Sequence, residues 1–133
     1  MPGSRFFDSN ILIYAFAKGD PRSERAATLL ADGGVINVQV LNEFANVSRR
    51  KLRWEWPAIE SALAVIADLL EPPRALTVDV HRHAVVLARD HQLSFYDALI
   101  VAAAAGAECT ELFTEDLQHG QRFGALRITD PFR

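Results

Sequence analysis

Four acidic residues are the part of this sequence best suited to chemistry: Asp8, Glu43, Asp97 and Asp116. Carboxylates that converge repel one another, by roughly 4 kcal/mol for two unit charges about 4 Å apart at an effective dielectric of about 20. A bound cation offsets this repulsion. Oxygen ligands without histidine or cysteine favour hard ions, so we expect Mg²⁺, with Mn²⁺ as the alternative, rather than zinc. Carboxylate-held Mg²⁺ usually acts on phosphates, where it activates a water and stabilises the departing oxygen.

The elements that must carry these acids alternate between short strands and helices. Short apolar runs predict strands at residues 5–7, 35–37, 75–77, 112–114 and 126–128. Helical spacing of apolar residues predicts helices at 11–17, 21–31, 38–51, 57–70, 79–90 and 94–105. The polar segment 115–124 is predicted to be a loop. This alternation indicates an α/β protein: one three-layer domain over residues 1–133, with a central, mostly parallel sheet of four to five short strands flanked by helices.

Helix-start signals support two of these helices. Asp20 and Pro21 suit the N-cap and the first position of the helix predicted at 21–31, and Ser94 suits the N-cap of the last helix. Both helices should therefore begin at those residues.

Three of the four acids fall at one edge of the predicted sheet. In parallel sheets the functional edge lies at the carboxyl ends of the strands. Asp8 directly follows the first strand, Asp97 lies in the first turn of a helix, and Asp116 is two residues beyond the strand that ends at Thr114. Glu43 has to enter this edge from a helix.

Each acid also has an ordinary structural explanation. Asp8 could simply cap the helix that follows it, and Asp97 could stabilise the first turn of its helix. Glu43 could belong to a solvated helix face or form an ion pair with Arg50. The fourth acid, Asp116, could be a plain loop residue. Only the joint placement of the four favours a functional site.

Composition limits the remaining classes of protein. The chain has 133 residues, half of them hydrophobic, which is enough for one buried core. Its net charge of -3 creates no general attraction for nucleic acid, so any such contact must use local patches or bound cations. The single cysteine, Cys109, excludes an internal disulfide and has no cationic neighbour in sequence that would activate its thiol. No apolar stretch approaches membrane-span length, and we expect a soluble, cytoplasmic protein with no membrane contact.

Four segments resemble, in order and spacing, the motifs of PIN-domain ribonucleases, and in particular VapC-type toxins: Phe6–Tyr14 (FFDSNILIY), Leu41–Phe44 (LNEF), Leu93–Ile100 (LSFYDALI) and Leu112–Leu117 (LFTEDL). Together they span nearly the whole chain. The resemblance implies that the metal-binding and catalytic set is Asp8, Glu43, Asp97 and Asp116. It also implies supporting roles, orienting carboxylates or waters, for three polar residues: Ser9, Asn10 and Thr114.

The same resemblance implies a substrate and partners. We expect cleavage of single-stranded or structured RNA by metal-activated water, a homodimer, and a cognate antitoxin whose arm covers the acidic groove. A guanidinium from that arm could replace the charge of the metal. The only dense basic cluster could guide RNA phosphates: Arg49, Arg50, Lys51 and Arg53. Trp54, Trp56 and Tyr96 could stack on unpaired bases. A helix end that favours cations would explain the cluster equally well.

Two competing classes stay open at this stage. A phosphoacceptor signalling domain also gathers acids at strand ends and binds Mg²⁺, but it needs paired early acids and a late lysine. Here the first strand is followed by Asp8, Ser9 and Asn10, and no lysine follows Lys51. A catalytically silent PIN-like binding module would have lost a core acid, and this chain has all four.

Overall fold

The computed structural model describes residues 4–133, which form a mixed α/β domain. Its strands are β1 (Arg5–Phe7), β2 (Glu111–Phe113), β3 (Arg122–Phe123) and β4 (Leu126–Thr129). Its helices are α1 (Ser9–Phe16), α2 (Ser23–Ala31), α3 (Val38–Arg50), α4 (Trp56–Leu69), α5 (Val78–His91) and α6 (Phe95–Gly106).

The sheet has the order β1-β2-β4-β3, with β1, β2 and β4 parallel and β3 antiparallel to β4. Phe7 pairs with Phe113, which in turn pairs with Thr129, so the three parallel strands end side by side. Backbone hydrogen bonds continue the ladder past the strand ends, from Asp8 N–H to Phe113 O and from Thr114 N–H to Thr129 O. The chain therefore leaves β1 and β2 at adjacent points on one edge.

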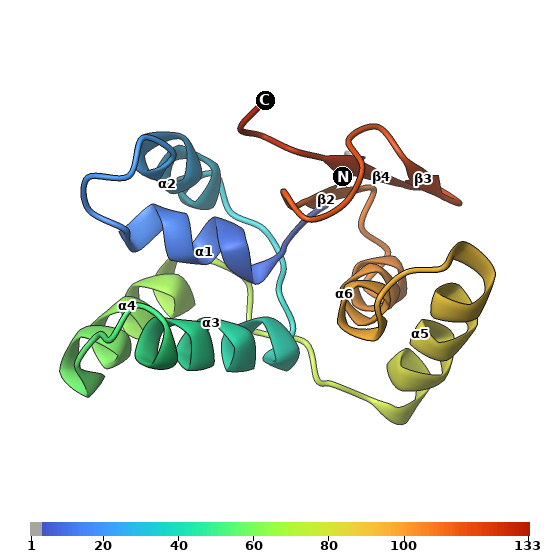
Figure 1. Ribbon diagram of the computed structural model, residues 1–133, viewed down its shortest axis with the longest axis horizontal. Coiled ribbons are helices and arrows are strands. Elements are labelled where there is room, and N and C mark those ends of the chain that lie inside the picture. Colours follow the sequence, from blue (N-terminus) through green and yellow to red (C-terminus); the bar gives the residue numbers. More distant parts are fainter. Residues whose placement is uncertain (1–3) are drawn as a thin grey trace.

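Helices flank the sheet on both sides, as the predicted three-layer arrangement requires. Figure 1 shows α1 to α4 grouped on one side of the molecule and α5 and α6 on the other. The core between them contains the fully buried side chains of Phe6, Leu12, Phe44 and Leu112. α6 is buried along most of its length, because its alanines let the helix lie close to its neighbours. None of the helices in residues 4–133 combines the length and apolar character needed to cross a membrane.

Two predicted strands are wrong. The segment 35–37 makes only isolated bridges, from Val35 to Phe6 and from Asn37 to Arg74, and residues 75–77 make none. The first run is cut short because Asn37 is the N-cap of α3, its side chain accepting a hydrogen bond from Val40 N–H at 3.1 Å. The predicted strand at 75–77 fails for the same reason, since its last residue, Thr77, caps α5.

The prediction for the 115–124 loop missed strand β3. Phe123 pairs with Leu126 across a two-residue turn in which Gly124 has φ of +61°. Positive φ is easy for glycine, and glycine at the first central position of a two-residue turn is a recognised hairpin signal. The start of α2 was also wrong: the helix begins at Ser23, because Asp20 accepts a hydrogen bond from Arg22 N–H at 2.8 Å in the turn that precedes it. Ser94 is the N-cap of α6, as predicted.

Candidate active site

Asp8 occupies the point where β1 gives way to α1. It is the N-cap of α1, and its Oδ1 accepts a hydrogen bond from Ser9 N–H at 2.7 Å. Only 4% of the residue is exposed. Burial, together with the charges of Glu43 and Asp116, raises the pKa of Asp8 to about 7, although hydrogen bonds from Thr114 and Ser9 lower it. Capping thus explains one oxygen of this carboxylate, and it does not explain why the group is buried among other acids.

A polar network joins Asp8 to Asp116. The Thr114 hydroxyl donates to Asp8 Oδ2 at 2.8 Å and accepts from Asp116 N–H at 3.1 Å. The Asn10 amide donates to Thr114 Oγ1 at 3.3 Å and to Asp116 Oδ2 at 3.1 Å. Thr114 is fully buried and sits directly after β2, so the network ties the ends of β1 and β2 together.

Glu43 reaches the same edge from α3. Its Oε1 accepts a hydrogen bond from the Ser9 hydroxyl at 3.1 Å, and its Oε2 accepts one from Gln39 at 3.2 Å. Burial raises the pKa of Glu43, and the charges of Asp97 and Asp116 raise it further. The alternative of an ion pair with Arg50 is wrong, because no ion pair within residues 4–133 includes Glu43.

Asp97 lies in the first turn of α6. Its backbone N–H donates to the Ser94 hydroxyl at 3.4 Å. Its carboxylate, by contrast, makes no hydrogen bond with any described residue, so a reciprocal capping box is not formed. Asp97 is half-buried and close enough to Glu43 to affect the ionisation of that residue.

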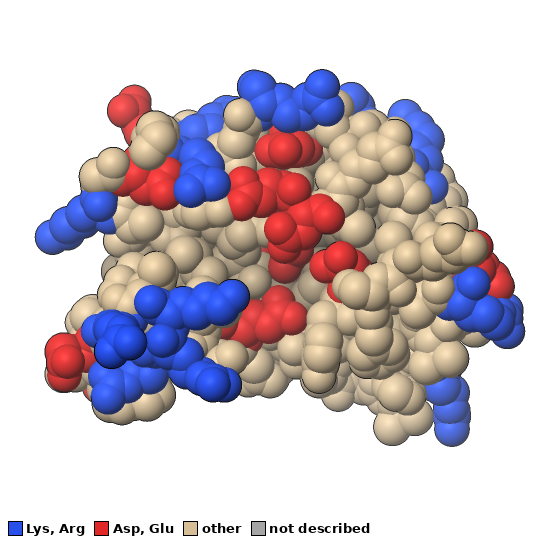
Figure 2. All heavy atoms as spheres, in the orientation of Figure 1, with Lys and Arg blue, Asp and Glu red and all other residues tan. Residues whose placement is uncertain are grey.

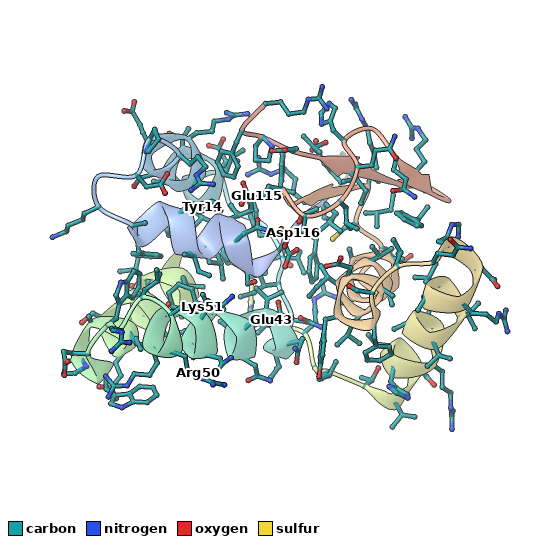
Figure 3. The ribbon with its side chains drawn as sticks, in the orientation of Figure 1. Tyr14, Glu43, Arg50, Lys51, Glu115 and Asp116 are labelled. Carbon is teal, nitrogen blue, oxygen red and sulfur yellow. The ribbon has the colours of Figure 1, made fainter. Side chains whose placement is uncertain are left out.

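The four acids lie close enough together to affect one another. In addition to burial, the charges of Glu43 and Asp116 raise the pKa of Asp8. In addition to burial, those of Asp97 and Asp116 raise the pKa of Glu43. Figure 2 shows acidic side chains in a band down the middle of one face, which we call the acidic groove. Figure 3 shows Glu43 and Asp116 approaching one another from α3 and from the segment after β2. None of the ion pairs formed by residues 4–133 includes any of the four. The negative charge of the groove is therefore not compensated by a basic side chain of this part of the chain.

This donor set fits a hard divalent cation. Across the described residues no three acidic, histidine or cysteine side chains are close enough to hold an ion alone. Mg²⁺ does not need such a cage, since it keeps several waters and is usually held by one or two carboxylates and by substrate phosphates. The buried Oδ1 of Asn10 also has no hydrogen-bond partner in the protein, which leaves one more free oxygen among the carboxylates.

Comparison with known proteins identifies the family of this chain. The family model for the PIN domain matches residues 5–122. This chain belongs to the PIN domain family.

Solved structures share the fold of this PIN domain at low sequence identity. The Mycobacterium tuberculosis toxin VapC20, described as cleaving the Sarcin-Ricin loop, is 23% identical with a TM-score of 0.69, over 85% of this chain and 92% of that one. A toxin-antitoxin complex from Klebsiella pneumoniae is 22% identical with a TM-score of 0.70, over 96% of this chain and 98% of that one. VapBC2 from Rickettsia felis, bound to a DNA fragment from its promoter, is 21% identical with a TM-score of 0.68, over 93% of this chain and 96% of that one. A search of curated proteins finds no match.

A second charged cluster in this PIN domain supports the segment that carries Asp116. The Tyr14 hydroxyl donates to Glu115, and Arg22 contacts the same carboxylate at 3.3 Å. Arg22 also pairs with Asp20 at 2.8 Å and lies over the Tyr14 ring at 3.6 Å. Burial and the bond to Glu115 raise the pKa of Tyr14 to about 12. Tyr14 and Glu115 lie in two of the quoted motifs, but the sequence did not predict that they meet or that Arg22 joins them. The cluster anchors Glu115 and thereby the neighbouring Asp116 (Figure 3).

The predicted basic cluster lies at the end of α3, beside the acidic band (Figure 2). Arg49 is partly committed to the protein, since it donates to Trp54 O at 3.0 Å and lies 5.1 Å from the centre of the Trp56 ring. The other three basic residues are exposed and are absent from the ion pairs of residues 4–133: Arg50, Lys51 and Arg53. Arg49, Arg50 and Arg53 share with Glu55 a hollow of about 600 Å³.

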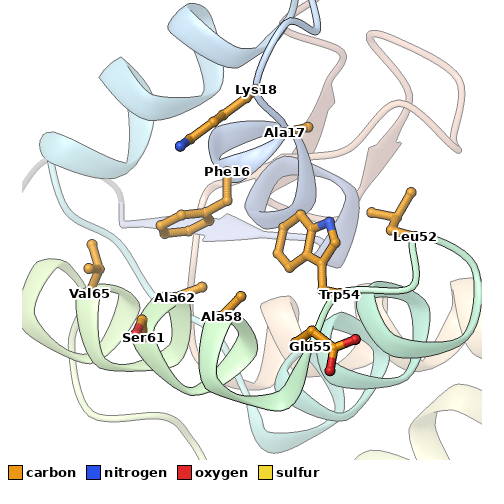
Figure 4. Close-up of a pocket in the computed structure, with 10 residues that line it drawn as sticks. All are labelled: Phe16, Ala17, Lys18, Leu52, Trp54, Glu55, Ala58, Ser61, Ala62 and Val65. Atoms are coloured by element: carbon orange, nitrogen blue, oxygen red, sulfur yellow. The ribbon is translucent and has the colours of Figure 1, made fainter.

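An apolar cavity of the PIN domain has none of the four acids in its lining. It has a volume of about 780 Å³ and a mostly apolar lining from the end of α1, the α3–α4 turn and α4, which includes Phe16, Trp54 and Ala62 (Figure 4). Trp54 packs edge-on against the buried Phe44 with ring centres 6.0 Å apart. This tryptophan therefore belongs to an apolar wall, whereas Trp56 is half exposed on the surface.

Proposed function

We propose that this PIN domain is a divalent-metal-dependent endoribonuclease that cleaves single-stranded or structured RNA by metal-activated water. The observation that carries the proposal is the uncompensated acidic groove, in which a buried, hydrogen-bonded Asp8 faces further carboxylates. Such a concentration of charge is costly without a cation. Support also comes from VapC20, a structural relative that is described as a Sarcin-Ricin loop cleaving toxin.

In this proposal the metal-binding and catalytic residues are Asp8, Glu43, Asp97 and Asp116. When bound, Mg²⁺ or Mn²⁺ supplies an attacking water of lowered pKa and offsets the charge on the phosphate and the departing oxygen. The protein holds the acidic side chains in position. Ser9 orients Glu43, Asn10 orients Asp116, and Thr114 holds Asp8, each through a hydrogen bond.

The basic cluster gives the RNA backbone a place to bind outside the negative groove. Arg50, Lys51 and Arg53 are free to contact phosphates, and Arg49 fixes the shape of the turn through its bond to Trp54 O. Tyr96, 62% exposed beside Asp97, offers a ring for base stacking.

We further propose that the protein is the toxin of a toxin-antitoxin module, acting in the cytoplasm as a homodimer. Two of the structural relatives named above, from Klebsiella pneumoniae and Rickettsia felis, are described as toxin-antitoxin complexes. A basic antitoxin side chain placed in the groove would neutralise the negative charge of Asp8 and its neighbours. It would thereby block the site to a cation and to RNA.

The nuclease is tested with purified, antitoxin-free protein and single-stranded RNA. Cleavage should require Mg²⁺ or Mn²⁺, stop when EDTA is added, and return when excess metal is restored. Cleavage that continues in EDTA at the same rate would exclude the proposed mechanism.

The toxin role needs a separate test, because a nuclease need not be a toxin. Expression of the chain alone should arrest bacterial growth, and expression of the Asp8→Ala variant should not. Growth that continues while the purified protein cleaves RNA would assign this PIN domain a different cellular role.

A further inference from the structure

A third hollow, smaller than the two described above, shares Glu43 with the acidic groove. It has a volume of about 440 Å³, lies between α3 and the start of α6, and is lined by five residues: Gln39, Asn42, Glu43, Asn46 and Tyr96. Apart from Glu43, every lining side chain is neutral and polar or aromatic. The hollow thus differs both from the acidic band beside it and from the basic cluster at the end of the same helix.

Helix α3 places its polar residues on one face. Gln39, Asn42, Glu43 and Asn46 follow the i, i+3, i+4, i+7 spacing, while Val40, Phe44 and Ser48 are buried on the other side. Asn42 and Asn46 are exposed, and neither amide forms a hydrogen bond with another described residue. Asparagine is a poor helix former, so two exposed asparagines in mid-helix do not serve the stability of α3.

Tyr96 closes the other side of the hollow. It is 62% exposed, and its ring meets the neighbouring Phe95 edge-on with centres 5.7 Å apart. Phe95 thus contacts one side of the tyrosine ring and leaves most of its surface open. An exposed tyrosine beside unpaired amides is the combination by which proteins recognise unpaired bases, through stacking and through hydrogen bonds to base edges.

Building on the proposed endoribonuclease function, we propose that this hollow, the base pocket, binds one unpaired nucleobase adjacent to the cleaved phosphodiester. Each amide offers both a donor and an acceptor and can therefore pair with the edge of a base. Away from a bound cation Glu43 repels a phosphate, whereas a base carries no charge. Arg50 lies seven residues from Glu43, about 10 Å along the helix at 1.5 Å per residue, and can take a phosphate of a neighbouring nucleotide.

The base pocket is tested by cleavage of a pool of single-stranded RNAs of random sequence, in Mn²⁺, with sequencing of the new ends. We expect the wild-type protein to prefer one base at one position beside the cut. Asn42→Ala or Asn46→Ala should reduce that preference about tenfold, the discrimination expected of a paired base edge. Tyr96→Ala should raise KM about fivefold or more by removing a stacking surface, and Tyr96→Phe should keep the wild-type KM.

Glu60→Ala, an exposed substitution on α4 outside the hollow, is the control for general surface effects and should keep the wild-type cleavage profile. If the two asparagine variants and Tyr96→Ala cut the pool with wild-type base preference and KM, the hollow does not bind a base. If the wild-type protein cuts no RNA in Mn²⁺ or Mg²⁺, the proposed function fails and the base pocket fails with it. The two failures are distinguishable because the first leaves an active nuclease.

Discussion

Replacing Asp8 by asparagine should make the metal-free protein more stable at alkaline pH. Asp8 is almost fully buried, and its pKa rises from 3.8 to about 7 on folding. A carboxyl whose pKa is higher in the folded state lowers the free energy of unfolding as pH rises from the unfolded pKa to the folded pKa. The full penalty, reached above pH 7, is about 4 kcal/mol.

Asparagine keeps the shape of the side chain and removes the charge. It also loses an acceptor for either Ser9 N–H or the Thr114 hydroxyl, which costs about 1 kcal/mol. At pH 8 in EDTA we therefore expect the free energy of unfolding of the Asp8→Asn variant to be about 3 kcal/mol higher than that of the wild type. At pH 5 most of this advantage should be gone, because folded wild-type Asp8 is then protonated.

Urea unfolding followed by circular dichroism at pH 5 and pH 8, in EDTA, measures both differences. The change between the two pH values, about 3 kcal/mol, does not depend on the lost hydrogen bond and so isolates the ionisation of Asp8. Asp68→Asn, an exposed acid on α4, is the matched control. If the Asp8→Asn variant is more stable than the wild type by the same amount at both pH values, the reasoning is refuted that Asp8 is a buried carboxylate whose charge no basic side chain compensates.

Three further outcomes are expected. Thr114→Val, which keeps the buried volume but leaves Asn10 and Asp116 N–H without their shared acceptor, should lower the free energy of unfolding by about 1 to 3 kcal/mol and reduce RNA cleavage, as measured by urea titration and by kcat. The double variant Arg50→Ala/Arg53→Ala should lower the slope of log KM against log salt concentration by about 1.4, from two lost phosphate contacts, whereas Arg82→Ala on α5 should not change it. Cys109 is buried and its pKa is raised to about 11 by burial, so iodoacetamide at pH 7.5 should label it only after denaturation, as mass spectrometry would show.

The strand-end acids could be predicted from the sequence because local rules place them. Asp8 follows an apolar triplet and precedes a helix, and parallel pairing then brings it to the end of β2. Glu43 was different. Its position depends on how α3 packs beside α1, which is a contact between distant segments, and only the motif pointed to it. The hydrogen bond from the Ser9 hydroxyl now gives its placement a physical basis.

The two wrongly predicted strands have a common cause, because a residue of each segment caps the helix that follows it. The apolar run at 35–37 and the run at 75–77 both end in a helix cap, Asn37 or Thr77, and capping removed the residue that a strand would need. The segment 35–37 also runs very close to β1, since a Cβ on Gly34 would overlap the Phe7 ring. Of the base-pocket amides only Asn42 lies in a quoted motif, and no sequence signal predicts that Asn42 and Asn46 share a hollow with Tyr96, because that depends on how α3 and α6 are placed.

Cleavage of single-stranded RNA in Mg²⁺ or Mn²⁺ by the Asp97→Asn variant tests the four-acid site most directly. The carboxylate of Asp97 makes no hydrogen bond with other described residues, so its replacement removes one ligand charge with little effect on packing. Asp79→Asn is the matched control, because Asp79 also lies in the first turn of a helix but belongs to α5. We predict a loss of at least about 100-fold in kcat/KM for Asp97→Asn and no loss for Asp79→Asn. Wild-type cleavage by Asp97→Asn would contradict the assignment of the groove as the catalytic site.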